Sequence, residues 1–420
     1  MIRKLITNLT VLATTVVITI AALEICARIF YPEPVVETSA KQFMQHDELL
    51  GWKKISNHES QYVAPEFRTT MRLNSKGMRG PEFPYENGET DLRIVVLGDS
   101  YTEGYMVEFE EMFSEVLRNE LVGRSDASVE VINLGTAGYS TDQELIFFQN
   151  EGKRYQQNLT VLMFYQNDIW YNSQDKYVRG YKPLFKMGEN GLTLTNFPVP
   201  APEARFYEKH FMGLPEPPSK KKNAGLVRRV KAFFGNHSRL YNFVVDRVKN
   251  SHDLYTLATK LGLAVDSPFR AMNSQIADEY RIWKTPYDED IRHSWDLTKR
   301  LILELNREVE SVDSRLLVSY IPNMANIYDD VWQATKRKYG LSDEAWSIER
   351  PRIELERFSE RNGITFLDLT PIFKQEAEIL QEQDKRLYYE VDGHWNVEGH
   401  ALAGQVLADF IRSRILKELP

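Results

Sequence analysis

Residues 95–104 read VVLGDSYTEG, an apolar run that stops at Gly98 and is followed at once by Asp99 and Ser100. The run has the length and composition of a buried β-strand. A serine at the end of such a strand is either a displayed nucleophile or a polar residue that caps the next helix. The rest of the sequence bears on which of the two roles Ser100 has.

The chain beyond this stretch alternates between strand-like and helix-like patterns. Helical periodicity covers 110–122, 141–156 and 288–312. Strands that alternate with helices require crossover connections, so the pattern predicts a mainly parallel sheet covered on both faces, that is, an α/β domain. The predicted strands are 93–97, 129–134, 160–164, 316–321 and 365–367.

Composition excludes several classes of protein. The chain has 420 residues, 42% of them hydrophobic and 27% charged, which is typical of globular proteins and unlike disordered ones. A net charge of −8 argues against nucleic acid as a partner, because a polyanion-binding surface needs excess positive charge. Cys26 is the single cysteine, so disulfides and a thiol nucleophile in the body of the chain are excluded.

The N-terminus predicts a membrane anchor. Leu5–Leu23 contains no charged residue and is long enough to cross a hydrocarbon core of ~30 Å as a helix. Arg3 and Lys4 precede it, so the positive-inside rule places the N-terminus in the cytoplasm and the rest of the chain outside. We therefore expect a single-pass protein of the inner membrane with an extracytoplasmic domain; a cleaved signal peptide is the alternative.

Three regions follow from these patterns: an anchor over 1–30, a linker and extended segment over 31–90, and the α/β domain over 91–420. Between the third and fourth predicted strands lie about 150 residues, too many for a single crossover. We expect an inserted, mostly helical subdomain at about 170–290, which begins with a hairpin turn at Asn190-Gly191. Its basic stretch, 219–233, is either a solvated helix face or a segment that lies on an anionic membrane surface.

Polar residues gather where the predicted strands end. Gly98–Ser100, Asn133–Gly138 and Gln166–Asp168 follow three of these strands, and DGHWNVEGH at 392–400 precedes the last amphipathic helix. Reactive groups of open parallel sheets collect at the carboxyl ends of strands. The pattern predicts that these four segments meet in one site.

Acyl transfer requires a nucleophile, a base, a group that orients the base, and donors for the developing oxyanion. Ser100, His394 and Asp392 can fill the first three roles, with Glu390 as the second candidate for the acid. The N–H groups of Ser100 and Gly138 and the side-chain amide of Asn167 can supply the oxyanion hole, since all three residues follow strand ends.

Several neighbouring residues have structural interpretations. We expect Asp99 to brace the turn and Asn396 to cap the last helix. His400 lies on that helix and is the histidine most easily mistaken for the base. The helix is expected to dock on the sheet through an apolar stripe of Leu402, Val406, Phe410 and Ile411.

The four segments resemble the blocks of the SGNH (GDSL-type) hydrolase family. GDSYTEG matches the serine block, NLGTAGYST the glycine block, YQND the asparagine block and DGHWN the histidine block, all in family order. The resemblance implies a three-layer α/β/α flavodoxin-like fold, with Ser100 as nucleophile, Gly138 and Asn167 as oxyanion donors and His394 as base. The sequence departs from the family pattern at Tyr165, which replaces a glycine, and at Asp392, which lies two rather than three residues before the histidine.

The resulting hypothesis is an exported, membrane-anchored serine esterase that hydrolyses acyl or O-acetyl esters of envelope glycans or lipids through an acyl-Ser100 intermediate. Two alternatives remain: a glycan O-acetyltransferase that uses the same serine, and a non-catalytic envelope protein that binds a glycan or a partner. The other histidines form no cluster at metal-ligand spacing, and no phosphate-binding glycine loop occurs, so the sequence predicts neither a metal nor a nucleotide cofactor.

Overall fold

The computed structural model describes residues 2–30, 43–64, 66–88, 90–123, 127–177, 180–189, 191–203, 233–234, 237–250 and 276–417. The chain forms two compact units. The smaller unit comprises 1–36 and 216–273, and the larger one comprises 37–215 and 274–420.

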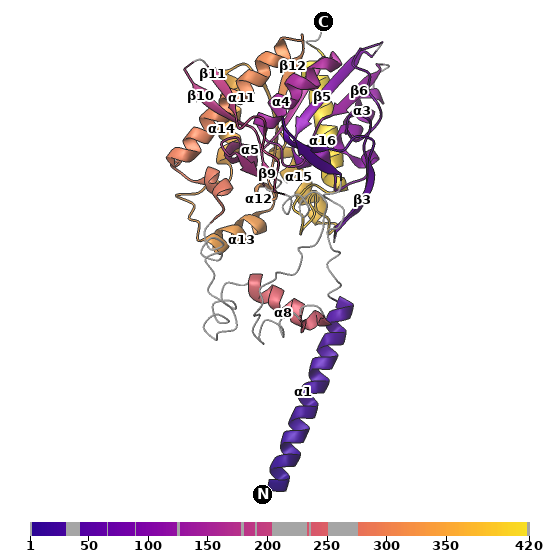
Figure 1. Ribbon diagram of the computed structural model, residues 1–420, viewed down its shortest axis with the longest axis vertical. Coiled ribbons are helices and arrows are strands. Elements are labelled where there is room, and N and C mark those ends of the chain that lie inside the picture. The colour runs from indigo at the N-terminus through magenta and orange to yellow at the C-terminus, as the bar shows by residue number, and fades with distance from the viewer. Residues whose placement is uncertain are drawn as a thin grey trace. The chain divides into compact units, whose positions relative to one another are not determined.

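The larger unit is built on a parallel sheet of five strands, in the order β13-β12-β7-β5-β6 (Figure 1). Numbered along the chain, these strands lie in the flavodoxin-like order 2-1-3-4-5. The predicted three-layer fold class and all five predicted strands are confirmed, because continuous apolar runs do mark strands that are buried on both faces. The strands are β5 (Leu92–Gly98), β6 (Val129–Asn133), β7 (Leu159–Tyr165), β12 (Arg315–Ile321) and β13 (Thr365–Asp368).

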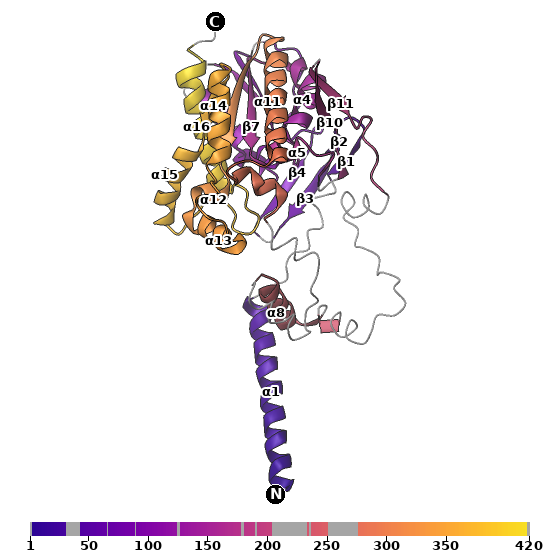
Figure 2. The ribbon, with the colours of Figure 1, turned by 90° about the vertical axis from the view of Figure 1, so that its left-hand side faces the viewer.

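Two groups of helices cover the two faces of this sheet, on opposite sides of the strands in Figure 1. On one face Val95, Leu162 and Val318 pack against α4 (Thr141–Asn150), α11 (Glu289–Glu310) and α14 (Arg350–Arg361). The 22-residue α11 runs along this face (Figure 2). On the other face Val96 and Val161 pack against α3 (Phe113–Val122), α15 (Thr370–Gln381) and α16 (Val397–Phe410).

The buried face of α16 differs from the predicted apolar stripe. Of the predicted residues, Ile411 is fully buried as expected and Leu402, Val406 and Phe410 are half-buried at the edge of the core, while His400, Ala403 and Leu407 are also fully buried. The reason is close packing on α3, because a Cβ at Gly404 would lie 2.6 Å from the Cβ of Val116. The face of α16 that contacts α3 is therefore the one with small residues, and the larger apolar residues lie on either side of it.

Residues 44–72 form two antiparallel hairpins that pack on the larger unit. The hairpins are β1 (Met44–Asp47) with β2 (Gly51–Lys54), and β3 (Glu59–Val63) with β4 (Arg68–Arg72). Trp52 and Met71 are fully buried and belong to the same hydrophobic core as α4 and α11. This segment is therefore an integral part of the larger unit.

The region between β7 and β12 is described in part. The predicted hairpin is confirmed by the pairing of β10 (Leu184–Gly188) with β11 (Gly191–Thr195), which follows the short pair β8 (Lys176–Tyr177) and β9 (Gly180–Tyr181). Most of the basic stretch 219–233 lies outside the described residues.

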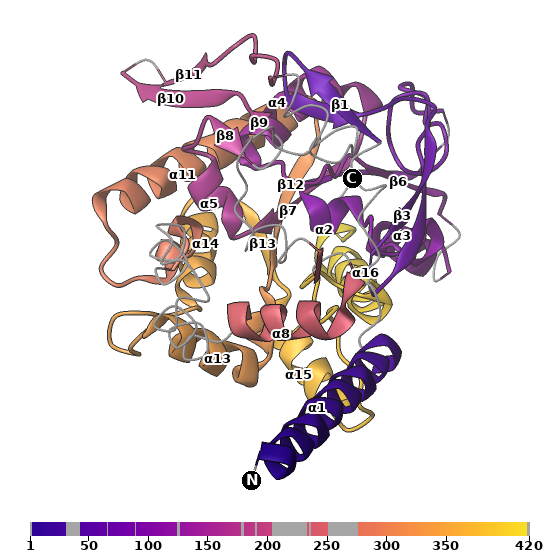
Figure 3. The ribbon, with the colours of Figure 1, turned by 60° about the horizontal axis from the view of Figure 1, so that its bottom comes forward.

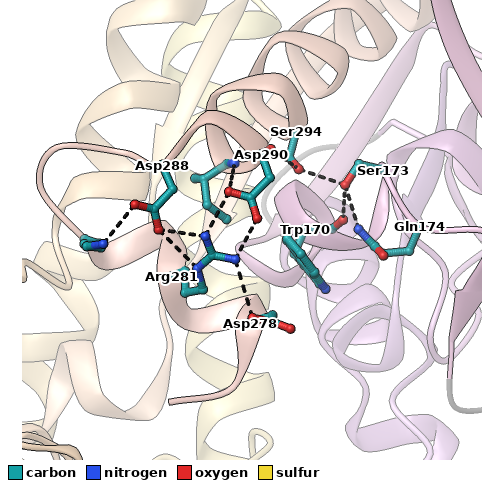
Figure 4. A network of polar contacts seen from close by, with 10 residues as sticks. Trp170, Ser173, Gln174, Asp278, Arg281, Asp288, Asp290 and Ser294 are labelled. Carbon is teal, nitrogen blue, oxygen red and sulfur yellow. Dashed lines mark hydrogen bonds and ion pairs between the residues drawn. The ribbon is translucent and has the colours of Figure 1, made fainter. Parts of the chain in front are cut away.

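A 3-10 helix, Asp278–Trp283 (η3), leads from this region back into the sheet domain. The Arg281 guanidinium donates to Asp288 at 2.7 Å and to Asp290 at 2.6 Å, which ties η3 to the start of α11 (Figure 4). The hydroxyls of Ser173 and Ser294 lie 2.8 Å apart and join the segment after α5 to α11 in the same view. The Trp283 indole donates to the Gln166 amide oxygen at 3.0 Å, which places η3 beside the carboxyl end of β7.

The smaller unit contains α1 (Ile2–Phe30) and α8 (Arg239–Asn250). Thr10–Phe30, with a mean hydropathy of 2.1, is long and apolar enough to cross a membrane. The Glu24 carboxylate of α1 accepts hydrogen bonds from the N–H groups of Arg239 (2.9 Å) and Leu240 (3.0 Å), so it caps the N-terminus of α8. Glu24 thus joins α1 to the start of α8.

Candidate active site

The carboxyl end of β5 presents Ser100. At Gly98 φ is +155°, and a Cβ there would lie 2.0 Å from the Thr102 hydroxyl oxygen, so only glycine fits. The chain then enters the short helix α2 (Ser100–Glu103), whose N-terminus is capped by Asp99 through a 2.9 Å hydrogen bond from the Tyr101 N–H. The cap is therefore Asp99, which braces the turn as predicted, and the Ser100 hydroxyl is left for another role.

Ser100 lies at the point where the strand order reverses. β5 is flanked by β6 on one side and β7 on the other, and α5 (Asn167–Tyr171) begins directly after β7. In open α/β sheets the crevice at such a switch point is where ligands bind. Figure 3 looks toward this end of the sheet, with α2 and α5 near the middle of the view.

Three candidate residues form a continuous chain of hydrogen bonds. Ser100 Oγ lies 2.8 Å from His394 Nε2, and His394 Nδ1 lies 2.6 Å from Asp392 Oδ1. The side chains of His394 and Asp392 are 21% and 20% exposed, so the pair is sheltered but reachable. A serine, an imidazole and a carboxylate in this order can generate an activated alkoxide.

A tight turn explains how an acid only two residues before the histidine reaches its ring. The Tyr389 N–H donates to the His394 carbonyl (2.9 Å), and the Gly393 N–H donates to the Tyr389 carbonyl (3.0 Å). Gly393 has φ +84°, which reverses the chain between Asp392 and His394. The Tyr101 hydroxyl donates to the Gly393 carbonyl at 3.0 Å and ties this turn to α2.

The reserve acid Glu390 and the second histidine, His400, occupy other environments. The Glu390 carboxylate is exposed and pairs with Arg386 at 3.3 Å. His400 is fully buried in α16, where its Nδ1 accepts the Phe113 N–H at 3.3 Å. Burial lowers the pKa of His400 to about 3, so this imidazole is neutral across the physiological range.

The proposed oxyanion donors line the same cavity as Ser100. Among the described residues, the backbone N–H groups of Ser100 and Gly138 donate no backbone hydrogen bond in the turns and loops. Gly138 has φ +81°, and a Cβ there would lie 2.7 Å from the ring of Tyr177. Gly138 thus has both the dihedral freedom and the space that a donor loop needs.

Asn167 begins α5 beside Asp99. Its amide oxygen is buried and has no hydrogen-bond partner within the described part of the chain. Burial raises the pKa of Asp99 to about 6, against the opposing effects of the His394 charge, the Tyr101 N–H, the Ser100 hydroxyl and the Asn167 amide. Asp99 is thus a buried carboxyl next to Ser100, with a pKa raised toward the physiological range.

The loop that carries Gly138 is held by residues from the N-terminal hairpins. The Trp52 indole donates to the Ala137 carbonyl at 3.0 Å, and the Lys54 amine donates to the Gly135 carbonyl. The Glu103 carboxylate accepts the Ala137 N–H at 2.9 Å. The position of Gly138 therefore depends on residues that precede β5 by about forty positions.

The candidate site opens into a cavity of about 530 Å³. Its wall is rich in aromatic side chains from α2, β7, η3 and the segment around α13 (Asp329–Tyr339). Polar groups among them come from Glu279, Asn323 and Lys338, while Met324 and Val331 are its larger aliphatic side chains. The aromatic lining comprises Tyr101, Tyr105, Tyr165, Tyr177, Tyr280, Trp283 and Tyr339.

Tyr165, which replaces a family glycine, is one of these wall residues. Its hydroxyl accepts a 2.7 Å hydrogen bond from the Asn323 amide, at the start of α12 (Met324–Ile327), and its ring packs 4.8 Å from that of Tyr101. Tyr165 thus joins β7 to the wall of the cavity next to Ser100.

No group of three or more histidine, cysteine, aspartate or glutamate side chains suited to a metal ion occurs among the residues that the structure describes.

Sequence reasoning missed the residues that support the site from the N-terminal hairpins. Trp52 and Lys54 were not singled out, although they are two positions apart and so lie on the same face of a strand. Glu66, which contacts the loop of Asp392, was also missed. The available signal for these supports was a tryptophan and a lysine on one strand face. It does not identify their partners, which are distant in sequence.

Comparison with known proteins identifies the region around this site. Residues 94–253 match the family model described as GDSL-like lipase/acylhydrolase. This match includes Ser100, Gly138 and Asn167. No curated protein matches the chain.

The chain is also similar to several solved structures, including those of three proteins. TesA is 9% identical over 76% of this chain and 98% of its own, with a TM-score of 0.34. The acetyl xylan esterase AlAXEase is 11% identical over 77% of this chain and 100% of its own (TM-score 0.35). The lipase/acylhydrolase from Enterococcus faecalis is 12% identical over 77% and 96% of the two chains (TM-score 0.35).

Proposed function

Because the chain belongs to the GDSL-like lipase/acylhydrolase family, we propose that it is a serine esterase with Ser100 as nucleophile, His394 as general base and Asp392 as the acid that orients it. The N–H groups of Ser100 and Gly138 and the Asn167 amide are proposed as the oxyanion hole. The observation that carries the proposal is the pair of hydrogen bonds, 2.8 Å and 2.6 Å, that link Ser100, His394 and Asp392.

The proposed reaction has two halves. Ser100 Oγ attacks the ester carbonyl while His394 Nε2 accepts its proton, and the carbonyl oxygen becomes an oxyanion that the donors stabilise. The C–O bond to the alcohol then breaks, and His394 returns the proton to the leaving oxygen. In the second half water attacks the acyl-Ser100 ester, His394 accepts the proton of water, and collapse releases the carboxylic acid and free Ser100.

The lining of the cavity favours a short acyl group on a polar alcohol. A long acyl chain needs continuous aliphatic surface, and Met324 and Val331 offer little of it. Aromatic faces with amide, carboxylate and ammonium groups between them suit the apolar faces and the hydroxyls of a sugar. We therefore propose O-acetylated envelope glycans as the preferred substrate class, ahead of long-chain lipid esters.

The location of the reaction is also part of this proposal. Thr10–Phe30 is long and apolar enough to cross a membrane, and Arg3 and Lys4 precede it. With the positive-inside rule, α1 anchors the protein in the inner membrane and the esterase acts outside the cytoplasm. Resistance to extraction by alkaline carbonate, with digestion of the catalytic domain by protease added from the outer side only, is the expected result.

Labelling with a fluorophosphonate tests the proposed nucleophile. In the full-length protein in detergent micelles we expect one adduct by intact mass, its absence in Ser100→Ala, and much slower formation in His394→Ala. Ser75→Ala is the matched control, because Ser75 is a surface serine bound to Glu82. A folded wild-type protein that forms no adduct would overturn the esterase proposal and favour a binding protein.

A substrate series then tests the substrate class. We expect 4-nitrophenyl acetate and acetylated sugars to be hydrolysed faster than 4-nitrophenyl palmitate. Release of acetate in water without any sugar acceptor supports hydrolysis. Release of 4-nitrophenol only in the presence of an acceptor sugar, with the acetyl group found on that sugar and not as free acetate, would replace hydrolysis by acetyl transfer.

A further inference from the structure

The hydrogen bonds of the turn described above hold Tyr389, Gly393 and His394, and the three residues between Tyr389 and Gly393 are bound elsewhere. Glu390, Val391 and Asp392 lie in turns outside helices and strands, and the Val391 side chain is 78% exposed, so it gives the loop no apolar anchor. The backbone N–H groups of these three residues point to a common acceptor. That acceptor is the carboxylate of Glu66, which is 324 residues distant from Glu390 in sequence.

Glu66 accepts hydrogen bonds from all three successive N–H groups. Its Oε1 lies 2.7 Å from the Glu390 nitrogen and 3.0 Å from the Val391 nitrogen. Its Oε2 lies 3.1 Å from the Val391 nitrogen and 2.8 Å from the Asp392 nitrogen. Hydrogen bonds to an ionised acceptor are about twice as strong as neutral ones, so this set is a substantial restraint on the loop.

Glu66 is itself presented by an ordered turn. It lies between β3 and β4, where the Ala64 N–H donates to the Phe67 carbonyl at 2.9 Å. The Phe67 ring packs 4.9 Å from the ring of Tyr389, which directly precedes the Glu390–Asp392 loop. The hairpin and the loop are thus joined both by an aromatic contact and by the carboxylate.

We propose that Glu66 is a positioning residue that holds Asp392 against His394. Asp392 has to stay 2.6 Å from His394 Nδ1, and its backbone nitrogen is bound by Glu66. Glu66 itself binds backbone groups only in these contacts and touches no reacting atom. Through it the β3–β4 hairpin controls the orientation of the base. This inference rests on the proposed function, because it assigns the support of the same Ser100–His394–Asp392 chain.

The decisive variant is Glu66→Gln. Glutamine has nearly the same shape but only one acceptor oxygen, and its NH2 group would face at least one of the loop N–H groups. We expect kcat for 4-nitrophenyl acetate to fall about ten- to a hundredfold with little change in KM, since a shift of the base by about 1 Å has effects of this size. Glu59→Gln, on the same hairpin but paired with Arg72 at the surface, is the matched control and should retain the wild-type rate.

A double-mutant cycle separates positioning from general damage to the fold. If Glu66 acts through Asp392, the Glu66→Gln change should have almost no effect on kcat in an Asp392→Asn background. The proposal would be overturned if Glu66→Gln lowered kcat by the same factor in both backgrounds. A Glu66→Gln enzyme with wild-type kcat would overturn it as well. A melting temperature within a few degrees of wild type identifies variants that are folded.

Fluorophosphonate labelling distinguishes this failure from failure of the proposed function. If wild-type Ser100 is labelled and Glu66→Gln is labelled equally fast, only the role of Glu66 is wrong. If folded wild-type protein is not labelled at all, the esterase proposal itself fails, and the positioning role fails with it.

Discussion

The indole N–H of Trp52 donates a 3.0 Å hydrogen bond to the carbonyl oxygen of Ala137, the residue directly before the proposed oxyanion donor Gly138. The Trp52 carbonyl in turn accepts the Tyr139 hydroxyl at 2.6 Å. One residue of β2 thus contacts the chain on both sides of Gly138. The N–H of Gly138 can stabilise an oxyanion only if it is fixed before the charge develops, because preorganisation supplies the effect.

Trp52→Phe should therefore impair catalysis as well as stability. The phenyl ring retains most of the packing but leaves the Ala137 carbonyl without its donor, which costs about 1–3 kcal/mol of stability for a buried group. We expect kcat for ester hydrolysis to fall about tenfold with little change in KM. The measurement is steady-state kinetics together with a urea unfolding curve. An unchanged kcat in a destabilised protein would show that the loop keeps its geometry without this bond.

The acid of the triad can be assigned by comparing two neighbouring carboxylates. Asp392 lies 2.6 Å from His394 Nδ1, whereas Glu390 pairs with Arg386. Asp392→Asn should lower kcat by about 10³- to 10⁴-fold, because an amide favours the wrong imidazole tautomer. Glu390→Gln keeps the backbone N–H that Glu66 binds and should be nearly as active as wild type. The reverse order of the two effects would assign the acid to Glu390.

The elements of the sheet were predictable because their signal is local. Buried parallel strands are continuous apolar runs, and the predicted run 93–97 corresponds to β5 at Leu92–Gly98. The serine, glycine, asparagine and histidine segments were predictable for a similar reason, since each follows a strand or precedes a helix within a few residues. The structure brings Ser100 and His394 together across 294 positions of sequence.

The supports of the site were not predictable, because their partners are distant. Lys54 and Glu66 each sit in a short hairpin segment where a charged residue is expected to face water. Whether such a residue meets solvent or another loop depends on how the hairpins pack, and no local pattern encodes that. The same limit explains the misjudged face of α16, where Gly404 rather than a large apolar residue decides the contact with α3.

Lys54 offers a test of the buried charges behind the oxyanion loop. Its amine is buried 3.9 Å from the Glu103 carboxylate and donates to the Thr136 hydroxyl at 3.2 Å. Burial lowers the pKa of Lys54, and Glu103 opposes this shift. Lys54→Met removes the cation that lies 3.9 Å from the buried Glu103 carboxylate and leaves Arg79 as the other nearby cation, so we expect the free energy of unfolding to fall by about 3 kcal/mol.

The double variant Lys54→Met with Glu103→Gln serves as the control for that loss. Removing both charges relieves the unpaired carboxylate, so the double variant should regain a large part of the lost stability in urea unfolding. The outcome against this expectation is additivity. If Glu103→Gln lowers the free energy of unfolding by the same amount in Lys54→Met as in the wild-type protein, the two charges do not interact.

His400 should make the protein sensitive to acid. Its imidazole is buried in α16, accepts the Phe113 N–H at Nδ1, and has a pKa lowered to about 3 from the ordinary 6.5 by burial, with the charges of Arg79 and His394 acting in the same direction. Above pH 6.5 the residue is neutral in both states and contributes nothing to pH dependence. Between pH 6.5 and about 3 only the unfolded chain binds the proton, so stability falls as pH falls, by about 3 kcal/mol between pH 7 and pH 4.

His400→Asn removes this titration while keeping an acceptor near the position of Nδ1. The variant should be less stable than wild type at pH 7, because the smaller side chain leaves a cavity, but its free energy of unfolding should fall less steeply with acid. Asp99, with a pKa raised to about 6 by burial, has the opposite pH dependence in both proteins and cancels in the comparison. Urea unfolding of the full-length protein in micelles at pH 7, 5.5 and 4 gives the two slopes. Parallel slopes for wild type and His400→Asn would mean that His400 takes up its proton in the folded protein.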